Sequence, residues 1–197
     1  MQGSKWAILI LILLSSCKKA DLTPDEYIKW LRSEKDMSKT EEIGPFKYKA
    51  DVVPAEWIAY TNLYPKGNVK DYGKKLEEAS GMYYMRLTID MKEGKLNALR
   101  YNLHAESEYF QRLYYVSYLM KNDIKLVVEG KEYPCRLYSY ERAYDLNSRL
   151  CFLLGFEKPE LSGDVSLEAV PSGINDDRVK MKFNGNVFQS FPKLSLE

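Results

Sequence analysis

The alternation of apolar and polar residues along the chain predicts a domain built mainly of β-strands. Seven runs of about five to ten residues place apolar side chains at every second position, the pattern of a strand with one buried face. These runs cover residues 46–53, 82–91, 124–129, 133–140, 150–157, 164–170 and 179–183. Short strands at this spacing, several of them separated by glycine-containing turns, are typical of an antiparallel β-sandwich-like domain.

An N-terminal helix is predicted before the first strand. The run Thr23–Glu26 (TPDE) has the form of a capping box, with proline at the first helical position and glutamate at the third. Tyr27, Trp30 and Leu31 follow at helical spacing and form one apolar stripe. Acidic residues flank this stripe, so we expect it to pack against the protein's own core and not against lipid.

Further along the chain, one or two short helices and one ambiguous segment are predicted. The first helix covers residues 55–63, and the second follows Asn68 and runs to Ala79. Residues 37–43 are polar and are interpreted as a linker. Residues 105–120 fit both a helix and a strand, and the favoured interpretation is a helix that gives way to a strand near Tyr114.

The first seventeen residues predict export. Lys5 is followed by nine uncharged apolar residues, Trp6–Leu14. Nine helical residues extend about 14 Å, which is roughly half of a hydrocarbon core, so this run has the length of a signal-peptide hydrophobic region. The tetrad Leu14-Ser15-Ser16-Cys17 comes directly after it.

This tetrad resembles the lipobox of bacterial lipoproteins. The resemblance implies cleavage before Cys17 and lipidation of its thiol, so that the mature chain is held on the membrane by acyl chains. The expected organisation is a signal peptide (1–16), an anchor, tether and helix (17–43), and a single β-rich domain (44–197). The alternative is an ordinary secretory signal with an incidental cysteine.

The residues that follow Cys17 bear on where the lipoprotein resides. The next two residues are Lys18 and Lys19, with no aspartate beside the anchor and no acidic run. By resemblance to lipoprotein sorting rules, this favours the outer membrane and a periplasm-facing domain. Residues 46–57, 124–156 and 192–194 also resemble uncharacterised envelope lipoproteins of Bacteroidetes-type bacteria, a resemblance that implies no activity.

Composition narrows the class of protein further. The 197 residues suffice for one ordinary domain, and 29 basic against 28 acidic side chains lack the positive excess of a nucleic-acid-binding module. Cys135 and Cys151 are the two cysteines left after lipidation. In an exported protein they either form a disulfide, which would contribute about 3 kcal/mol, or remain as buried free thiols. The sequence leaves both alternatives open.

Few features of the sequence indicate a catalytic site. His104 is the single histidine, and it is interpreted as a solvated or capping residue, although a dyad with Cys135 or Cys151 stays open. Residues 67–75 (GNVKDYGKK) lack the spacing of a phosphate-binding loop. Neither a metal site nor a cofactor is predicted. The favoured function is therefore non-catalytic.

Aromatic residues are the most prominent compositional feature, with 16 tyrosines and three tryptophans. Most are expected to fill a half-buried sheet. Trp57, Tyr60 and Tyr64 are the candidate row for ligand binding. We expect an envelope protein that binds a partner or supports an assembly. The alternatives are a glycan-binding module and a hydrolase that uses paired carboxylates.

Overall fold

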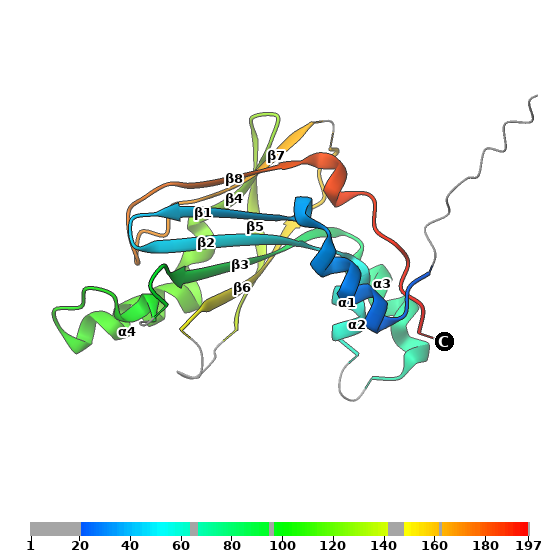
Figure 1. The fold of residues 1–197 in the computed structure, drawn as a ribbon, viewed down its shortest axis with the longest axis horizontal. Coiled ribbons are helices and arrows are strands. Elements are labelled where there is room, and N and C mark those ends of the chain that lie inside the picture. The colour runs from blue at the N-terminus through cyan, green and yellow to red at the C-terminus, as the bar shows by residue number, and fades with distance from the viewer. Residues whose placement is uncertain (1–20, 64–66, 95–96, 142–147, 162, 197) are drawn as a thin grey trace, which may run out of the picture.

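A computed structural model describes residues 21–63, 67–94, 97–141, 148–161 and 163–196. Within them, eight strands form one antiparallel sheet in the order β1-β2-β3-β6-β5-β4-β7-β8 (Figure 1). The strands are β1 (Ser38–Ile43), β2 (Phe46–Val53), β3 (Met82–Met91), β4 (Ile124–Val128), β5 (Lys131–Glu141), β6 (Leu150–Glu157), β7 (Asp164–Ala169) and β8 (Val179–Asn184). The mainly antiparallel β architecture expected from the sequence is confirmed.

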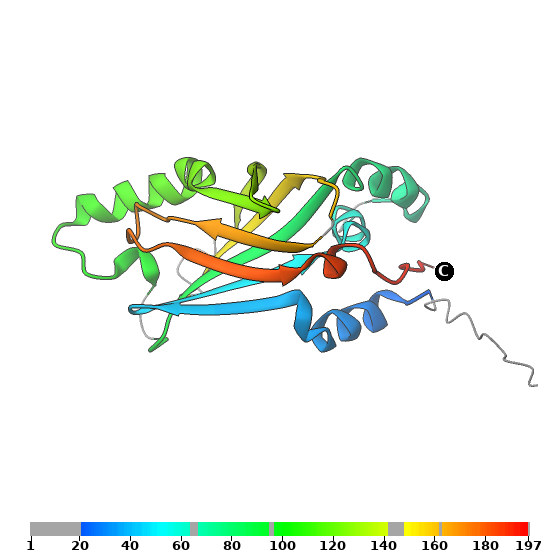
Figure 2. The same cartoon turned by 90° about the horizontal axis from the view of Figure 1, so that it is seen from above.

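The sheet folds over on itself at β5. Residues 131–134 of this strand pair with β4, and the pairing with β6 begins at Cys135. An irregularity between Cys135 and Leu137 accompanies the change, as expected because bulges bend a strand and increase its twist. The two halves of the sheet therefore face each other, and the edge strands β1 and β8 lie side by side (Figure 2).

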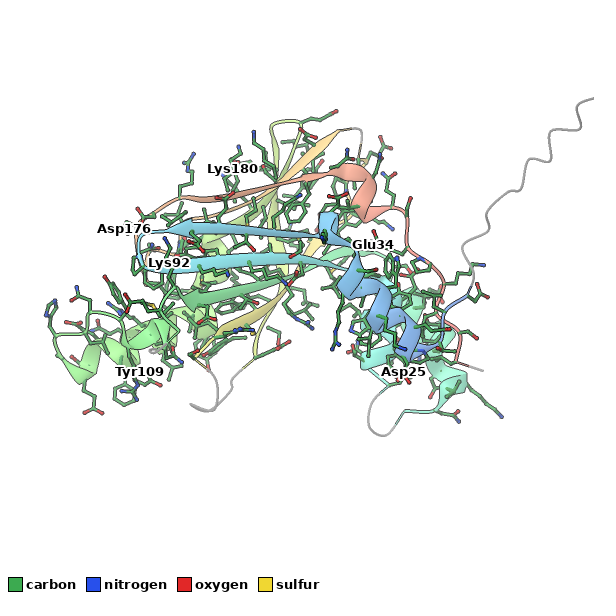
Figure 3. All side chains as sticks on the ribbon, in the orientation of Figure 1. Asp25, Glu34, Lys92, Tyr109, Asp176 and Lys180 are labelled. Carbon is green, nitrogen blue, oxygen red and sulfur yellow. The ribbon has the colours of Figure 1, made fainter. Side chains whose placement is uncertain are left out.

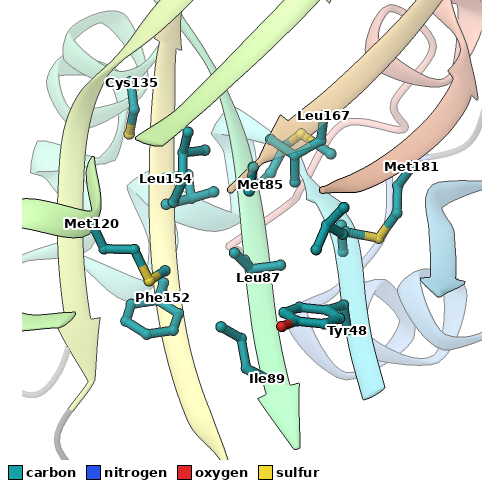
Figure 4. Packing of buried hydrophobic residues seen from close by; sticks show 14 of the residues in the cluster. Tyr48, Met85, Leu87, Ile89, Met120, Cys135, Phe152, Leu154, Leu167 and Met181 are labelled. Atoms are coloured by element: carbon teal, nitrogen blue, oxygen red, sulfur yellow. The ribbon is translucent and has the colours of Figure 1, made fainter. Parts of the chain in front are cut away.

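The core fills the space between the two halves of the sheet. Tyr48, Leu87 and Phe152 point inward from β2, β3 and β6 and meet Leu167 and Met181 from β7 and β8 (Figure 4). Each of these side chains is at most 1% exposed. Their positions follow the period of two in the sequence, because successive residues of a strand point to opposite faces. This interior is the main hydrophobic core of the domain.

Helices cover the two ends of the sheet. The α-helices are α1 (Pro24–Ser33), α2 (Ala55–Thr61), α3 (Tyr72–Ala79) and α4 (Glu106–Tyr114), and α4 continues into a π-helical turn, η4 (Tyr115–Leu119). Short 3-10 turns are η1 (Lys35–Met37), η2 (Val69–Asp71), η3 (Ala98–Arg100), η5 (Met120–Asp123) and η6 (Gly185–Phe188). Val53 and Tyr84 on the outer face of the sheet pack with Ile58 of α2 and Ala79 of α3.

The interpretation of residues 37–43 as a linker is wrong, because residues 38–43 form strand β1. This strand makes a hairpin with β2, in which Ile43 pairs with Phe46 across a turn containing Gly44 at φ +54°. It is an edge strand, and three of its six side chains are exposed. Its polar composition suits that position, since charged residues protect an edge from further pairing.

The strand predicted from Tyr114 onward is also wrong. Residues 106–123 are helical throughout, as α4, η4 and η5 in succession. The residues that fitted the helical pattern, Tyr109, Leu113 and Val116, are those that pack against the core. Of the residues that fitted the strand pattern, Tyr114 and Tyr118 are more than half exposed, whereas Val116 and Met120 are buried.

Helix α1 docks on the domain as the sequence predicted. Tyr27 is fully buried, and its ring stacks on Trp57 of α2 with centroids 5.9 Å apart and planes 7° apart. The capping box forms, because the backbone N–H of Thr23 donates to Glu26 Oε2 at 2.9 Å. Leu22 forms a parallel bridge with Leu194, so the start of the described chain and its C-terminal segment lie together.

Replacing Tyr27 with phenylalanine is expected to stabilise the domain by about 1 kcal/mol, because a buried hydroxyl without a hydrogen bond costs free energy. Among the described residues, the Tyr27 hydroxyl has no hydrogen-bond partner. The matched control is Tyr48→Phe, since Tyr48 Oη donates to Asn175 Oδ1 at 3.0 Å. This control should lose about 1 kcal/mol. Urea unfolding measures both, and a Tyr27→Phe variant that is less stable than the parent would contradict the prediction.

Candidate functional site

Exposed apolar side chains gather on one helical segment. Five large hydrophobic residues of the described chain are prominently exposed, and four of them lie within residues 110–119. They are Phe110 (59% exposed), Tyr114 (58%), Tyr118 (56%) and Leu119 (44%). We refer to these four residues as the aromatic stripe. Apolar surface concentrated in this way is typical of an interaction site, whereas single exposed apolar residues are ordinary.

The aromatic stripe follows from the spacing of the helix. Tyr109, Leu113, Val116 and Met120 pack against the core, and Val116 and Met120 are fully buried. Intervals of four, three and four residues keep this set on one face of a helix. The neighbouring residues then form a second line at positions 110, 114 and 118, which faces away from the sheet. The segment thus has two apolar faces, of which the domain buries one.

Hydrogen bonds hold the end of this segment in its π-helical form. The backbone N–H of Met120 donates to Tyr115 O, and the Tyr138 hydroxyl of β5 donates to Val116 O. Tyr115 Oη donates to Asp123 Oδ2 at 2.6 Å, and burial raises the pKa of Tyr115 above its usual value, so it remains a neutral donor. π-Helical turns of this kind are frequent at functional sites.

The glycine at position 173 allows the Tyr115 ring to sit where it does. A Cβ atom on Gly173 would lie 2.3 Å from two ring carbons of Tyr115, which is far inside van der Waals contact. Only glycine permits this close approach of backbone to ring. The packing therefore fixes Tyr115, and with it the direction of the π-helical turn that carries Tyr118 and Leu119.

The residues before α4 are also fixed to the helix. Arg112 Nη1 donates to the carbonyl oxygens of Leu99, at 3.4 Å, and of Tyr101. The Arg100 guanidinium lies 4.5 Å from the centroid of the Tyr109 ring, within the range of a cation–π interaction. The aromatic stripe is thus preorganised, which lowers the entropy cost of binding.

The rings of the aromatic stripe do not form a flat platform. The ring centroids of Tyr114 and Tyr118 are 5.2 Å apart and their planes are tilted by 48°, while the planes of Phe110 and Tyr109 meet at 77°.

Helix α4 lies at the end of the sheet remote from α1, as the labelled residues Tyr109 and Asp25 show (Figure 3). The last described residues of the chain lie at the α1 end (Figure 1).

The structure describes two of the three residues that were predicted to form a ligand-binding row. Trp57 and Tyr60 lie on α2, where their ring centroids are 5.2 Å apart and Trp57 stacks on Tyr27. Both are half-buried. These two rings thus take part in packing α1 against α2, and Trp57 also lines a cavity beside α1. Tyr64 lies outside the described residues.

The two cysteines are free thiols, so the disulfide alternative is not what the structure shows. They lie at opposite ends of the β5–β6 ladder, with Cys135 opposite Phe156 and Cys151 opposite Glu141. Cys135 is buried, and burial raises the pKa of its thiol to about 11. Burial also raises the pKa of the half-buried Cys151 thiol. Both thiols are therefore protonated at neutral pH.

His104 is exposed just before α4, and its backbone N–H donates to Glu108 Oε2 at 3.1 Å. This placement fits the interpretation of a solvated residue at a helix start. Among the described residues, no group of three or more His, Cys, Asp or Glu side chains is placed to hold a metal ion. None of the helices in that part of the chain is both long and apolar enough to cross a membrane.

Comparison of the chain with known proteins finds similar solved structures but no matching family. No family model and no curated protein matches it. One similar solved structure is a protein of unknown function from Burkholderia pseudomallei K96243, with 12% identity, 85% of this chain and 92% of that chain covered, and a TM-score of 0.37. Another is a DUF4426 family protein from Pseudomonas aeruginosa PAO1, with 10% identity, 75% and 92% covered, and a TM-score of 0.33.

Proposed function

We propose that the chain is a lipid-anchored cell-envelope protein that binds a protein partner through the aromatic stripe. The observation that carries the proposal is the concentration of exposed apolar side chains on α4 and η4, where four of the five prominently exposed large hydrophobic residues of the described chain lie. Leaving these rings in water forgoes the free energy of burying them, roughly 25 cal/mol per Å² of apolar surface. A partner that covers the stripe would recover that free energy.

The lipobox resemblance at Leu14–Cys17 supports the anchor and fixes the expected orientation. Leu22, five residues beyond Cys17, is bound to the C-terminal segment at the α1 end of the domain. Five residues span at most about 18 Å when fully extended. The α1 end would therefore lie against the membrane, and the aromatic stripe would point away from it. In the expected setting, an outer-membrane lipoprotein, that direction is the periplasm.

The shape of the aromatic stripe favours a protein over a saccharide as its occupant. Saccharide chains place the C–H faces of their rings on exposed, roughly coplanar aromatic rings, but Tyr114 and Tyr118 are tilted by 48°. Tilted rings at helical spacing instead offer ridges and grooves to an apolar surface on another protein. Tyrosine and phenylalanine are also among the residues enriched at protein interfaces.

The test is photo-crosslinking in cells that make the full lipoprotein. A benzophenone amino acid at Tyr118 should give one discrete adduct with a second protein. The same group at Val69 should give none, since Val69 is equally exposed (57%) but lies on η2, near the α1 end. Adding Phe110→Ser and Tyr114→Ser should abolish the adduct.

Other outcomes of the crosslinking would overturn the proposal. An adduct of two copies of this chain would make the aromatic stripe a homodimer interface. Adducts with lipid or polysaccharide would assign the stripe to a different class of ligand. No adduct at Tyr118, or equal adducts at Tyr118 and Val69, would remove the case for a partner at the stripe.

A further inference from the structure

A second surface, on the outer face of the sheet, has different chemistry from the aromatic stripe. Two cavities of about 530 Å³ each lie there, one beside α1 and the other farther along β2, β3 and β6. They share Lys49, Asp51 and Arg86 as lining residues. The two cavities thus adjoin at these residues, and we refer to them together as the outer-face groove.

Basic side chains outnumber acidic ones in the outer-face groove. Six basic and four acidic residues line the two cavities. The basic residues are Arg32, Lys35, Lys47, Lys49, Arg86 and Arg149, and the acidic residues are Glu34, Asp51, Asp90 and Glu141. Two ion pairs each neutralise one basic and one acidic residue of the lining. They join Lys49 to Asp51 at 2.7 Å and Arg149 to Asp90 at 2.9 Å. The remaining charge in the groove is positive.

Arg86 is the central cation of the groove. It lies on β3 directly opposite Asp51 of β2, but the Asp51 carboxylate is bound to Lys49. Within the described residues, no carboxylate forms an ion pair with Arg86, and its side chain is exposed where the two cavities meet. A guanidinium in that situation has all its donors available to a carboxylate or a phosphate.

The floor of the groove excludes recognition of a ligand through its main chain. The groove runs across β2, β3 and β6, whose backbone groups pair with one another over eight positions on each side of β3. A bound peptide would therefore find no free backbone donors or acceptors in the floor, in contrast to binding at a sheet edge. Side chains must recognise the occupant, and the net charge that they offer is positive.

The end of the groove beside α1 adds an apolar wall. Leu31, Val53 and Trp57 line this cavity together with Arg32 and Lys35. The Trp57 ring is held in place by stacking on Tyr27. An indole beside cationic side chains suits a ligand whose rings are partly apolar and carry anionic substituents.

We propose that the outer-face groove binds an acidic saccharide chain, one that carries carboxylates or phosphates along its length. Arg86 would hold an anionic substituent at the centre, Arg32 and Lys35 would hold one at the α1 end, and a sugar ring would pack on the Trp57 wall. Cys151 lines the far end of the groove. This inference rests neither on the aromatic stripe nor on its partner.

The first test measures binding of a short oligogalacturonate to the mature lipoprotein in detergent by calorimetry. Saturable binding that weakens with added salt is expected. Arg86→Gln should weaken it roughly tenfold, the usual scale for losing a hydrogen bond between charged groups. The matched control is Arg178→Gln, because Arg178 is exposed and does not line the groove. This control should bind like the parent.

The second test uses the Cys151 thiol as a reporter, since it lines the groove whereas the buried Cys135 does not. Oligogalacturonate should slow alkylation of Cys151 several-fold and leave Cys135 unchanged. Absence of binding, or equal losses in Arg86→Gln and Arg178→Gln, would overturn the proposal. Equal affinity for neutral maltooligosaccharides, for oligoglutamate or for phosphatidylglycerol vesicles would also overturn it, by removing the saccharide or its charge as the recognised feature.

Discussion

Replacing Phe152 with alanine is expected to lower the free energy of unfolding by about 3–5 kcal/mol. Phe152 is fully buried on the inward face of β6. Its ring stacks on Tyr138 and Tyr140 of β5, with centroids 5.6 and 5.2 Å away. Truncation removes both stacking contacts and leaves a cavity between the two halves of the sheet. Because domains are stable by only about 5–15 kcal/mol, this variant should be close to unfolding.

The matched control for this prediction is Phe110→Ala, which makes the same truncation on the aromatic stripe. Phe110 is 59% exposed, so its loss should change the stability by about 0.5 kcal/mol or less. Urea unfolding followed by tryptophan fluorescence compares the two variants. If Phe110→Ala costs as much as Phe152→Ala, then the stripe supports the fold and is not a surface held open for a partner.

Seven of the eight described strands were predictable because the apolar side chains that face the core recur at every second position. In β3, Tyr83, Met85, Leu87 and Ile89 alternate with outward residues, and none of the four is more than 7% exposed. One face of the strand is enclosed by the opposite half of the sheet, so selection for burial acts on every second residue. The same alternation places Arg86 on the outer face.

Strand β1 was not predictable in this way. As an edge strand with half of its side chains exposed, it needs no continuous apolar face. Its pairing with β2 is fixed by the backbone and by the turn at Gly44, and neither leaves a period in the sequence. A polar strand and a polar linker therefore look alike until the partner strand is known.

The aromatic stripe was not predictable either, because the sequence does not show which of two neighbouring tyrosines is exposed. Tyr114 and Tyr115 are adjacent and identical in type, yet Tyr114 is 58% exposed and Tyr115 only 9%. Contacts from distant parts of the chain decide between them, including the Tyr138 hydroxyl on Val116 O and the close approach of Gly173 to the Tyr115 ring. Local pattern carries no record of such contacts.

The charged residues of the outer-face groove were not predictable from local sequence pattern either. Lys49 lies on β2, Arg86 on β3, and Arg149 directly before β6, so their proximity depends on the order in which those strands pair. Trp57 was identified from the sequence as a binding residue because it is large and aromatic. The structure shows that one face of its ring packs on Tyr27, and that the residue also lines the groove.

Replacing Cys17 with serine is expected to move the protein from the membrane fraction to the soluble fraction. The acyl chains that the lipobox resemblance implies contribute about 0.8 kcal/mol for each buried methylene, and two or three chains together hold firmly. Serine has no thiol to carry them. The apolar run Trp6–Leu14 does not replace them, because nine residues reach roughly half-way across a hydrocarbon core.

Fractionation and mass spectrometry of the N-terminus measure this effect together. Cys135→Ser and Cys151→Ser are the controls, and both should stay on the membrane with an acylated N-terminus, since neither thiol lies near the lipobox. A Cys17→Ser protein that lacks acyl chains and still sediments with membranes would overturn the anchor. It would also remove the reason for placing α1 against the bilayer, because the short span from Cys17 to Leu22 fixes that orientation only if the thiol of Cys17 is held in lipid.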